Sequence, residues 1–150
     1  MGPMTDITIV REFDAPRELV FDAWTEPRHF AVWFGGATAD VPEESVRMDA
    51  RPGGTWSATM YAGPERHEIA WHGRYVEIDR PARLVLTLTD EPEEGEPLTV
   101  GFEDLDGGRT RMTFRQDGSR FDADQADATR AGWQSFFDVL DDLLRESQLD

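Results

Sequence analysis

The sequence contains no cysteine, no lysine and no asparagine among its 150 residues. Without cysteine, the chain forms neither disulfides nor thiolate metal sites. No apolar run approaches the length of a membrane span, and residues 1–10 lack the basic start and the apolar stretch of a signal peptide. We therefore expect a cytoplasmic protein without membrane insertion.

The charge is strongly one-sided. Fifteen basic residues, all of them arginine, face 31 acidic residues, which gives a net charge of -16. An acidic surface repels phosphate backbones and anionic lipid headgroups, so we expect no nucleic acid among the partners. The acidity fits a salt-rich cytoplasm, and it also fits the codon usage of a GC-rich genome, which we prefer.

The length is that of one ordinary domain, and no repeat or linker divides the chain. We expect a single domain over residues 4–150, with residues 1–3 a cloning remnant before a natural start at Met4. Chains of this length bury enough surface to be stable without disulfides or a structural metal.

Alternating apolar residues predict a strand at 6–13 and a series of later strands at hairpin spacing. The later strands are expected at 38–50, 55–61, 67–78, 84–89, 98–102 and 112–116. One inner face then carries Trp56, Ala58 and Met60, and the next strand presents Ile69, Trp71 and Tyr75. The run 38–50 is interrupted by a proline and two glutamates.

Helical spacing predicts two short helices after the first strand and a long one at 122–145. Pro16 suits a first helical turn, and Gly35-Gly36 ends the second helix. Asp122 and Gln125 have the spacing of a capping box, and the long helix would span about 36 Å. Strands grouped apart from helices predict an α+β fold, in which a curved antiparallel sheet of six or seven strands surrounds the long helix.

Four segments carry a resemblance to a known family. They are FDAPRELVFDAWT at 13–25, DARPGGTW at 49–56, HGRYVEI at 72–78 followed by RLV at 83–85, and GWQSFF at 132–137. The chain resembles the START-like, or SRPBCC, superfamily with its helix-grip fold, and within it the Aha-type family, named for homology to an activator of a heat-shock-protein ATPase. This resemblance implies an internal cavity for an apolar ligand. The namesake activator has an additional N-terminal domain that this chain has no room for, which argues against chaperone stimulation.

Aromatic residues make up 11% of the chain, and such residues either fill a core or line a pocket. With the implied cavity, we predict that a small apolar molecule binds between the long helix and the sheet. The predicted ligand-binding residues are Trp33, Phe34, Trp56, Met60, Trp71, Tyr75, Leu86, Phe102, Phe114, Trp133 and Phe136. Tyr75 and His72 would orient the ligand.

The histidines do not predict a metal site. His67 and His72 are five residues apart on an expected strand, so they face opposite sides of the sheet, unlike the helical pair of a zinc protease. We expect no cofactor and no metal.

Two other functions stay open at this point. One is an enzyme of the polyketide cyclase or aromatase kind, which would need a proton-transfer group such as Tyr75 or His72 deep in the pocket. The other is a co-chaperone or stress-response interaction module, which would need an exposed apolar patch. An edge strand could also support a homodimer.

Overall fold

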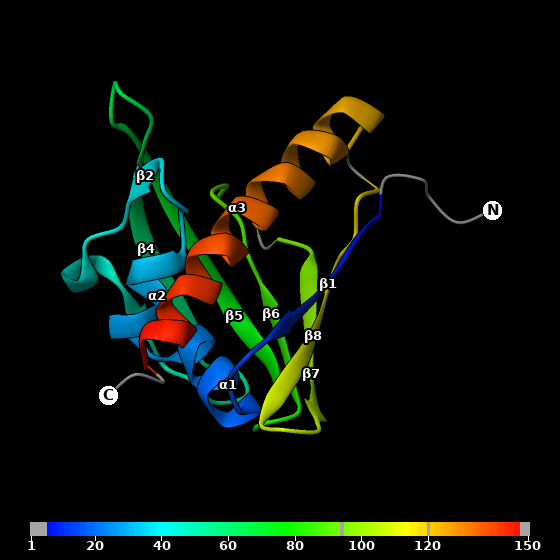
Figure 1. Ribbon diagram of the computed structural model, residues 1–150. Coiled ribbons are helices and arrows are strands. Elements are labelled where there is room, and N and C mark those ends of the chain that lie inside the picture. The colour runs from blue at the N-terminus through cyan, green and yellow to red at the C-terminus, as the bar shows by residue number, and fades with distance from the viewer. Residues whose placement is uncertain (1–5, 94, 120, 148–150) are drawn as a thin grey trace.

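The structure is a computed structural model that describes residues 6–93, 95–119 and 121–147 (Figure 1). The elements, in chain order, are β1 (Ile7–Phe13), α1 (Arg17–Thr25), α2 (Pro27–Trp33), β2 (Ala39–Asp40), the 3-10 turn η1 (Glu43–Ser45), β3 (Arg47–Met48), β4 (Thr55–Ala62), β5 (His67–Asp79), β6 (Arg83–Thr87), β7 (Pro97–Leu105), β8 (Arg109–Gln116) and α3 (Ala123–Ser147). The expected remnant at residues 1–3 lies outside the described residues.

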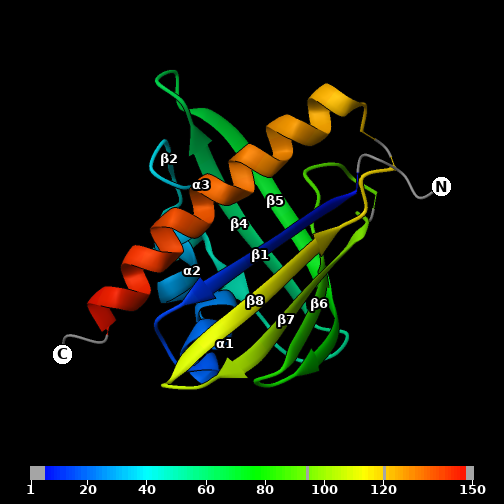
Figure 2. The same ribbon diagram turned by 45° about the vertical axis from the view of Figure 1, so that its right-hand side comes forward.

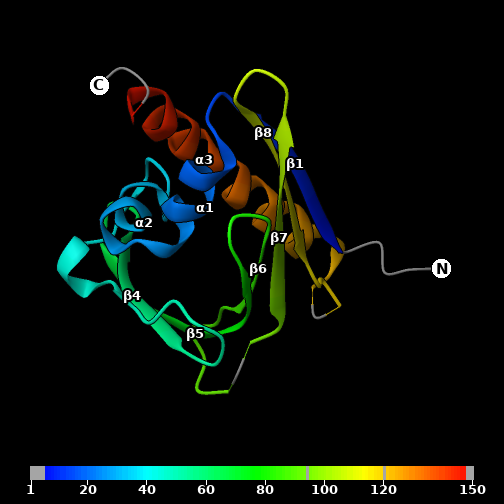
Figure 3. The ribbon, with the colours of Figure 1, turned by 90° about the horizontal axis from the view of Figure 1, so that it is seen from below.

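Within the described residues, eight strands form one antiparallel sheet in the order β1-β8-β7-β6-β5-β4-β2, with β3 also paired to β4. Figure 3 shows the sheet bending around the helices, with α1 and α2 in its hollow. Alternation along the strands places Ile7 and Ile9 of β1, and Leu84 and Leu86 of β6, on the inner, buried face. The predicted helix-grip α+β fold is confirmed.

The expected strand over 38–50 is two short strands instead. Between them lie Pro42 and the turn η1, which break the extended run where the sequence has proline and two glutamates. The Ser45 hydroxyl donates to the Pro42 carbonyl at 2.7 Å and accepts from the Thr59 amide at 3.1 Å. This turn is therefore docked on β4, and β2 and β3 pair with the two ends of that strand.

The long helix α3 begins with the predicted capping box. The Gln125 amide donates to the Asp122 carboxylate at 2.8 Å, and the Asp122 amide donates to the Gln125 side chain at 2.9 Å. From there the helix crosses the concave side of the sheet (Figure 2). Its inner face buries Trp133, Phe137 and Leu140 among the core residues.

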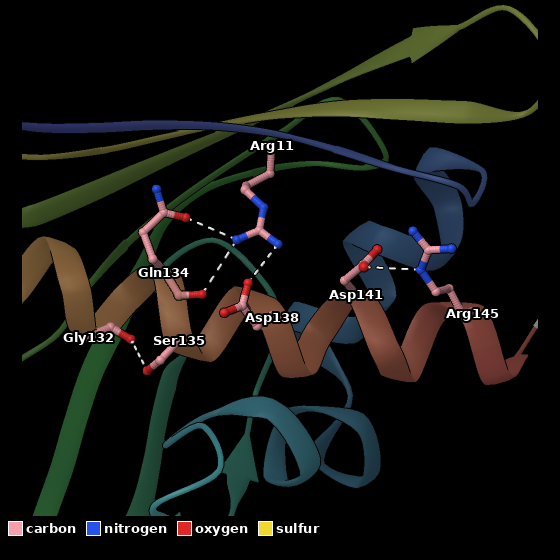
Figure 4. Close-up of polar contacts among 7 residues, drawn as sticks. All are labelled: Arg11, Gly132, Gln134, Ser135, Asp138, Asp141 and Arg145. Carbon is pink, nitrogen blue, oxygen red and sulfur yellow. Dashed lines mark hydrogen bonds and ion pairs between the residues drawn. The ribbon is translucent and has the colours of Figure 1, made fainter.

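One flank of α3 is fastened to β1 through arginines (Figure 4). The Arg11 guanidinium donates to the Gln134 side-chain oxygen at 3.0 Å and lies 3.0 Å from the Asp138 carboxylate. Arg130 of the helix donates to the Thr8 carbonyl at 2.8 Å. These contacts hold the middle of α3 beside the edge strand.

The short helices close the other end of the hollow. The Trp33 indole of α2 donates to the Ala23 carbonyl of α1 at 2.8 Å, which locks the two helices together. Gly35 and Gly36 then end α2 with φ of 108° and 68°, a left-handed backbone that glycine adopts at little cost. None of the helices in the described part of the chain combines the length and apolar character needed to cross a membrane.

Candidate functional site

A cavity of about 370 Å³ lies between α3 and the sheet. Its walls come from the end of α2, from β5, from the connection after β6, from the end of β8, from the segment before α3 and from α3 itself. The lining residues are Phe34, Trp71, Leu88, Thr89, Asp90, Gln116, Phe121, Thr129, Gly132, Trp133 and Phe136.

Helical spacing explains the α3 wall. Thr129, Gly132, Trp133 and Phe136 are separated by three, one and three residues, so they share one face of the helix. Gly132 has no side chain, and a Cβ placed there would meet no atom within 4 Å. The helix therefore leaves open space at Gly132.

The apolar wall is a continuous group of rings. The Phe34 ring lies 6.2 Å from Trp71 and 5.6 Å from Phe136, and Trp133 lies 5.4 Å from Phe136, measured between centroids. These contacts are T-shaped, an arrangement that aromatic quadrupoles favour. Phe34 and Trp133 are buried, whereas Trp71 and Phe136 are half-buried at the cavity surface.

The polar lining is sparse. The Trp133 indole donates to the Gln116 side-chain oxygen at 3.0 Å, which ties α3 to the end of β8. Thr89 and Thr129 add hydroxyls. Asp90 is exposed and is the one ionisable residue among the described lining residues.

The connection after β6 is held to β5 at its start. His72 and Thr89 exchange two backbone hydrogen bonds of 3.0 Å, and the His72 Nε2 lies 2.7 Å from the Glu91 carbonyl. His72 alternates with Trp71 along β5, so its ring lies on the outer face of the sheet. The histidine supports one wall of the cavity from behind and does not line it.

The predicted site residues fall into two groups. Phe34, Trp71, Trp133 and Phe136 line the cavity together. The others are buried in the core and are absent from the cavity lining: Trp33, Trp56, Met60, Tyr75, Leu86, Phe102 and Phe114. The rings of Phe114 and Trp133, 4.6 Å apart, show how this core packs directly beneath the cavity.

The two groups predicted to orient a ligand lie elsewhere. Tyr75 is 1% exposed, and its hydroxyl has no hydrogen-bond partner among the described residues. Burial, with a smaller contribution from the negative charge of Asp49, raises the pKa of this phenol well above its usual range. Like His72, Tyr75 is not part of the cavity lining.

Seven lining residues were not predicted: Leu88, Thr89, Asp90, Gln116, Phe121, Thr129 and Gly132. Thr129 and Gly132 share a helix face with Phe136, so helical spacing alone could have assigned them to the same cavity wall. Leu88, Thr89 and Gln116 fall within the expected strands 84–89 and 112–116, but alternation alone does not separate a cavity wall from packed core. Asp90 and Phe121 lie in connections without periodicity. No group of three or more histidine or acidic side chains within the described ranges is arranged to hold a metal ion.

The fold is shared with known proteins. The family model for Activator of Hsp90 ATPase homolog 1-like protein matches residues 14–145. A solved structure from Nitrosomonas europaea has a TM-score of 0.83 at 22% identity, covering 99% of this chain and 99% of that one. One from Chromobacterium violaceum has a TM-score of 0.79 at 23% identity, covering 93% and 96%.

A third similar structure, an AHSA1-like protein from Aeromonas hydrophila, has a TM-score of 0.74 at 22% identity and covers 96% of each chain. No curated protein matches this chain. At these identities the similar structures establish the fold and leave the ligand open.

Proposed function

Since the chain belongs to the family of Activator of Hsp90 ATPase homolog 1-like proteins, we propose that it binds a small, mostly apolar molecule in the cavity between α3 and the sheet. The cavity itself carries this proposal. Its volume of about 370 Å³ is within the ordinary range for small-molecule sites, and five of its eleven lining residues are aromatic, beside four polar or charged ones.

The energetics favour a compact aromatic or aliphatic ligand. Burial of apolar surface contributes about 25 cal/mol per Å², and the ring wall of Phe34, Trp71 and Phe136 provides the matching surface. Because association also loses translational and rotational freedom, a ligand of this size should bind in the micromolar range. Thr89, Thr129 and Gln116 would fix its orientation by hydrogen bonds.

The geometry gives less support to the two alternatives. A proton-transfer enzyme needs an acid or base deep in the pocket, and neither Tyr75 nor His72 lines the cavity. The ionisable residue of the described lining, Asp90, is exposed. A docking module needs a contiguous apolar patch. The exposed large apolar side chains among the described residues are Val10, Leu19, Val32 and Val76, on four different elements.

Gly132 offers a direct test with a matched control. Gly132→Phe should place a ring in the open space and exclude the fluorescent probe N-phenylnaphthylamine, whereas Gly132→Ala adds one methyl group and should leave its binding unchanged. Probe fluorescence and isothermal titration calorimetry measure the affinity. Equal binding by both variants, or no binding by the unmodified protein, would contradict the proposal.

A further inference from the structure

We propose that the cavity selects a cationic ligand, an amine whose apolar part packs against the aromatic wall and whose ammonium group lies beside Asp90. This inference rests on the proposed function and adds the chemical class of the ligand. The inference rests on three observations: the negative charge of Asp90 in the lining, the acidic residues near it in the sequence, and two nearby arginines that do not line the cavity.

The described lining residues carry a single charge, which is negative. Asp90 is the one ionisable group among them, and it makes no ion pair with another described residue. Asp90 is exposed and borders the same space as the aromatic rings of the lining. An ammonium group bound there would supply the missing counter-charge.

The connection that carries Asp90 is itself acidic. Glu91 and Glu93 are exposed close by in the sequence, and the whole chain has a net charge of -16. This field raises the local concentration of cations and repels carboxylates and phosphates. A fatty acid or a phosphorylated metabolite would therefore meet repulsion both on approach and at the entrance.

The arginines beside the helix do not reverse this charge. Arg11 is held by Gln134 and Asp138, and Arg130 donates to the Thr8 carbonyl. Arg11 therefore reaches from β1 to the flank of α3 that is fastened to the edge strand (Figure 4). Arg130 reaches from that helix back to β1. Neither arginine lines the cavity.

The aromatic wall suits the same ligand. The negative faces of aromatic rings attract ammonium groups, and tryptophan attracts them most strongly. Trp71 and Phe136 are half-buried lining residues that reach solvent near the entrance. A carboxylate among the same rings would gain nothing from their faces. The donors of the described lining residues are all uncharged: the Thr89 and Thr129 hydroxyls, the Gln116 amide and the Trp71 indole N–H, which has no described partner.

Three probes of one skeleton separate charge from apolar contact: phenylbutylamine, phenylbutanol and phenylbutyrate. The amine should bind the unmodified protein about tenfold more tightly than the alcohol at low salt, and the carboxylate more weakly than the alcohol. Isothermal titration calorimetry measures all three. The advantage of the amine should shrink as added salt screens the acidic connection.

Asp90→Asn should remove most of the advantage of the amine over the alcohol while leaving the affinity for the alcohol unchanged. The matched control is Asp104→Asn, which changes the net charge equally at an exposed position of β7 beside the β7–β8 turn. It should retain the preference. Unfolding curves of both variants verify that each is folded.

The outcomes distinguish this inference from the proposed function. If the three probes bind equally, or if Asp90→Asn keeps the preference, the cation selectivity is wrong and the apolar site stands. If none of the probes binds the unmodified protein, both proposals are overturned. An equal loss of preference in the two variants would assign it to overall charge and contradict the role of Asp90.

Discussion

At the scale of single residues, the absence of a side chain at Gly73 allows the Trp56 indole to reach across β5 from β4 to β6. The Trp56 indole of β4 passes Gly73 of β5 and donates to the Thr87 carbonyl of β6 at 2.9 Å. A Cβ at Gly73 would overlap that carbonyl and lie 2.5 Å from the indole nitrogen. The glycine is therefore required by close approach of a neighbouring side chain and backbone.

We expect Gly73→Ala to destabilise the protein by about 3 kcal/mol or more, because the added methyl group must displace backbone or break the Trp56 bond. Urea unfolding measures the loss. Gly101→Ala is the control, since a Cβ there meets no atom within 4 Å and β7 retains its pairing. Comparable losses in both variants would mean that the cost comes from the glycine backbone and not from the overlap.

The buried hydroxyl of Tyr75 makes stability depend on alkaline pH. Its pKa is raised in the folded state by burial, so above pH of about 10 the unfolded chain loses the proton first and unfolding is favoured. Stability is unaffected below that pH and then falls by about 1.4 kcal/mol per pH unit. Because the chain has no lysine or cysteine, few other groups titrate there.

Tyr75→Phe should remove this decline and, at neutral pH, stabilise the fold by about 1 kcal/mol, since the hydroxyl has no described partner. Urea unfolding across the alkaline range tests both effects. Tyr61→Phe is the matched control, because it removes a phenol hydroxyl and leaves the buried one in place. An undiminished decline in the Tyr75 variant would refute the assignment.

At the scale of elements, one face of α3 is held to β1 by polar contacts, and another face lines the cavity. We expect Arg11→Met to destabilise the protein by about 1–2 kcal/mol, because it removes contacts to both Gln134 and Asp138 from a partly buried position. Chemical unfolding gives this value, and the affinity for N-phenylnaphthylamine should fall as the helix loosens.

Arg145→Met is the control on the same helix. Arg145 pairs with Asp141 one turn away on an exposed face, 3.1 Å between nitrogen and oxygen (Figure 4). Because water screens the Arg145 charge, such a pair contributes little to stability. If the two variants lost equal stability, the contacts of Arg11 between α3 and β1 would stabilise the fold no more than an ion pair within the helix does.

The elements differ in how well the sequence predicts them. The start of α3 depends on Asp122 and Gln125, which are three residues apart, so a local pattern was sufficient. The inner faces of the strands follow from alternation, which placed Trp56 and Trp71 on the same side of the sheet. The expected strand over 38–50 was wrong because Pro42 and the turn after it interrupt the pairing.

The cavity was less predictable because it depends on where α3 crosses the sheet. Trp33 and Phe34 are neighbours in the sequence, yet Trp33 packs in the core and Phe34 lines the cavity. The same pattern of aromatic residues would fit either place. Asp90 and Gln116 join the lining through connections and strand ends, whose position is set by distant contacts.

At the scale of the whole molecule, the net charge of -16 should make stability depend on salt. Like charges on the folded surface repel one another, and added salt screens that repulsion within about 10 Å at 0.1 M. We expect the melting temperature to rise with sodium chloride from millimolar to several hundred millimolar. Differential scanning calorimetry measures the trend, and a flat or falling curve would show that ion pairs outweigh the repulsion.

The connection after β6 forms a cavity wall while standing outside the regular strand ladder, since β6 ends at Thr87 and only the Thr89 bridge to His72 follows. We expect substitutions in this connection to leave the register of the sheet intact, because the paired strands lie outside it. The chemical preference of the cavity and the pairing of the strands can therefore change independently of each other.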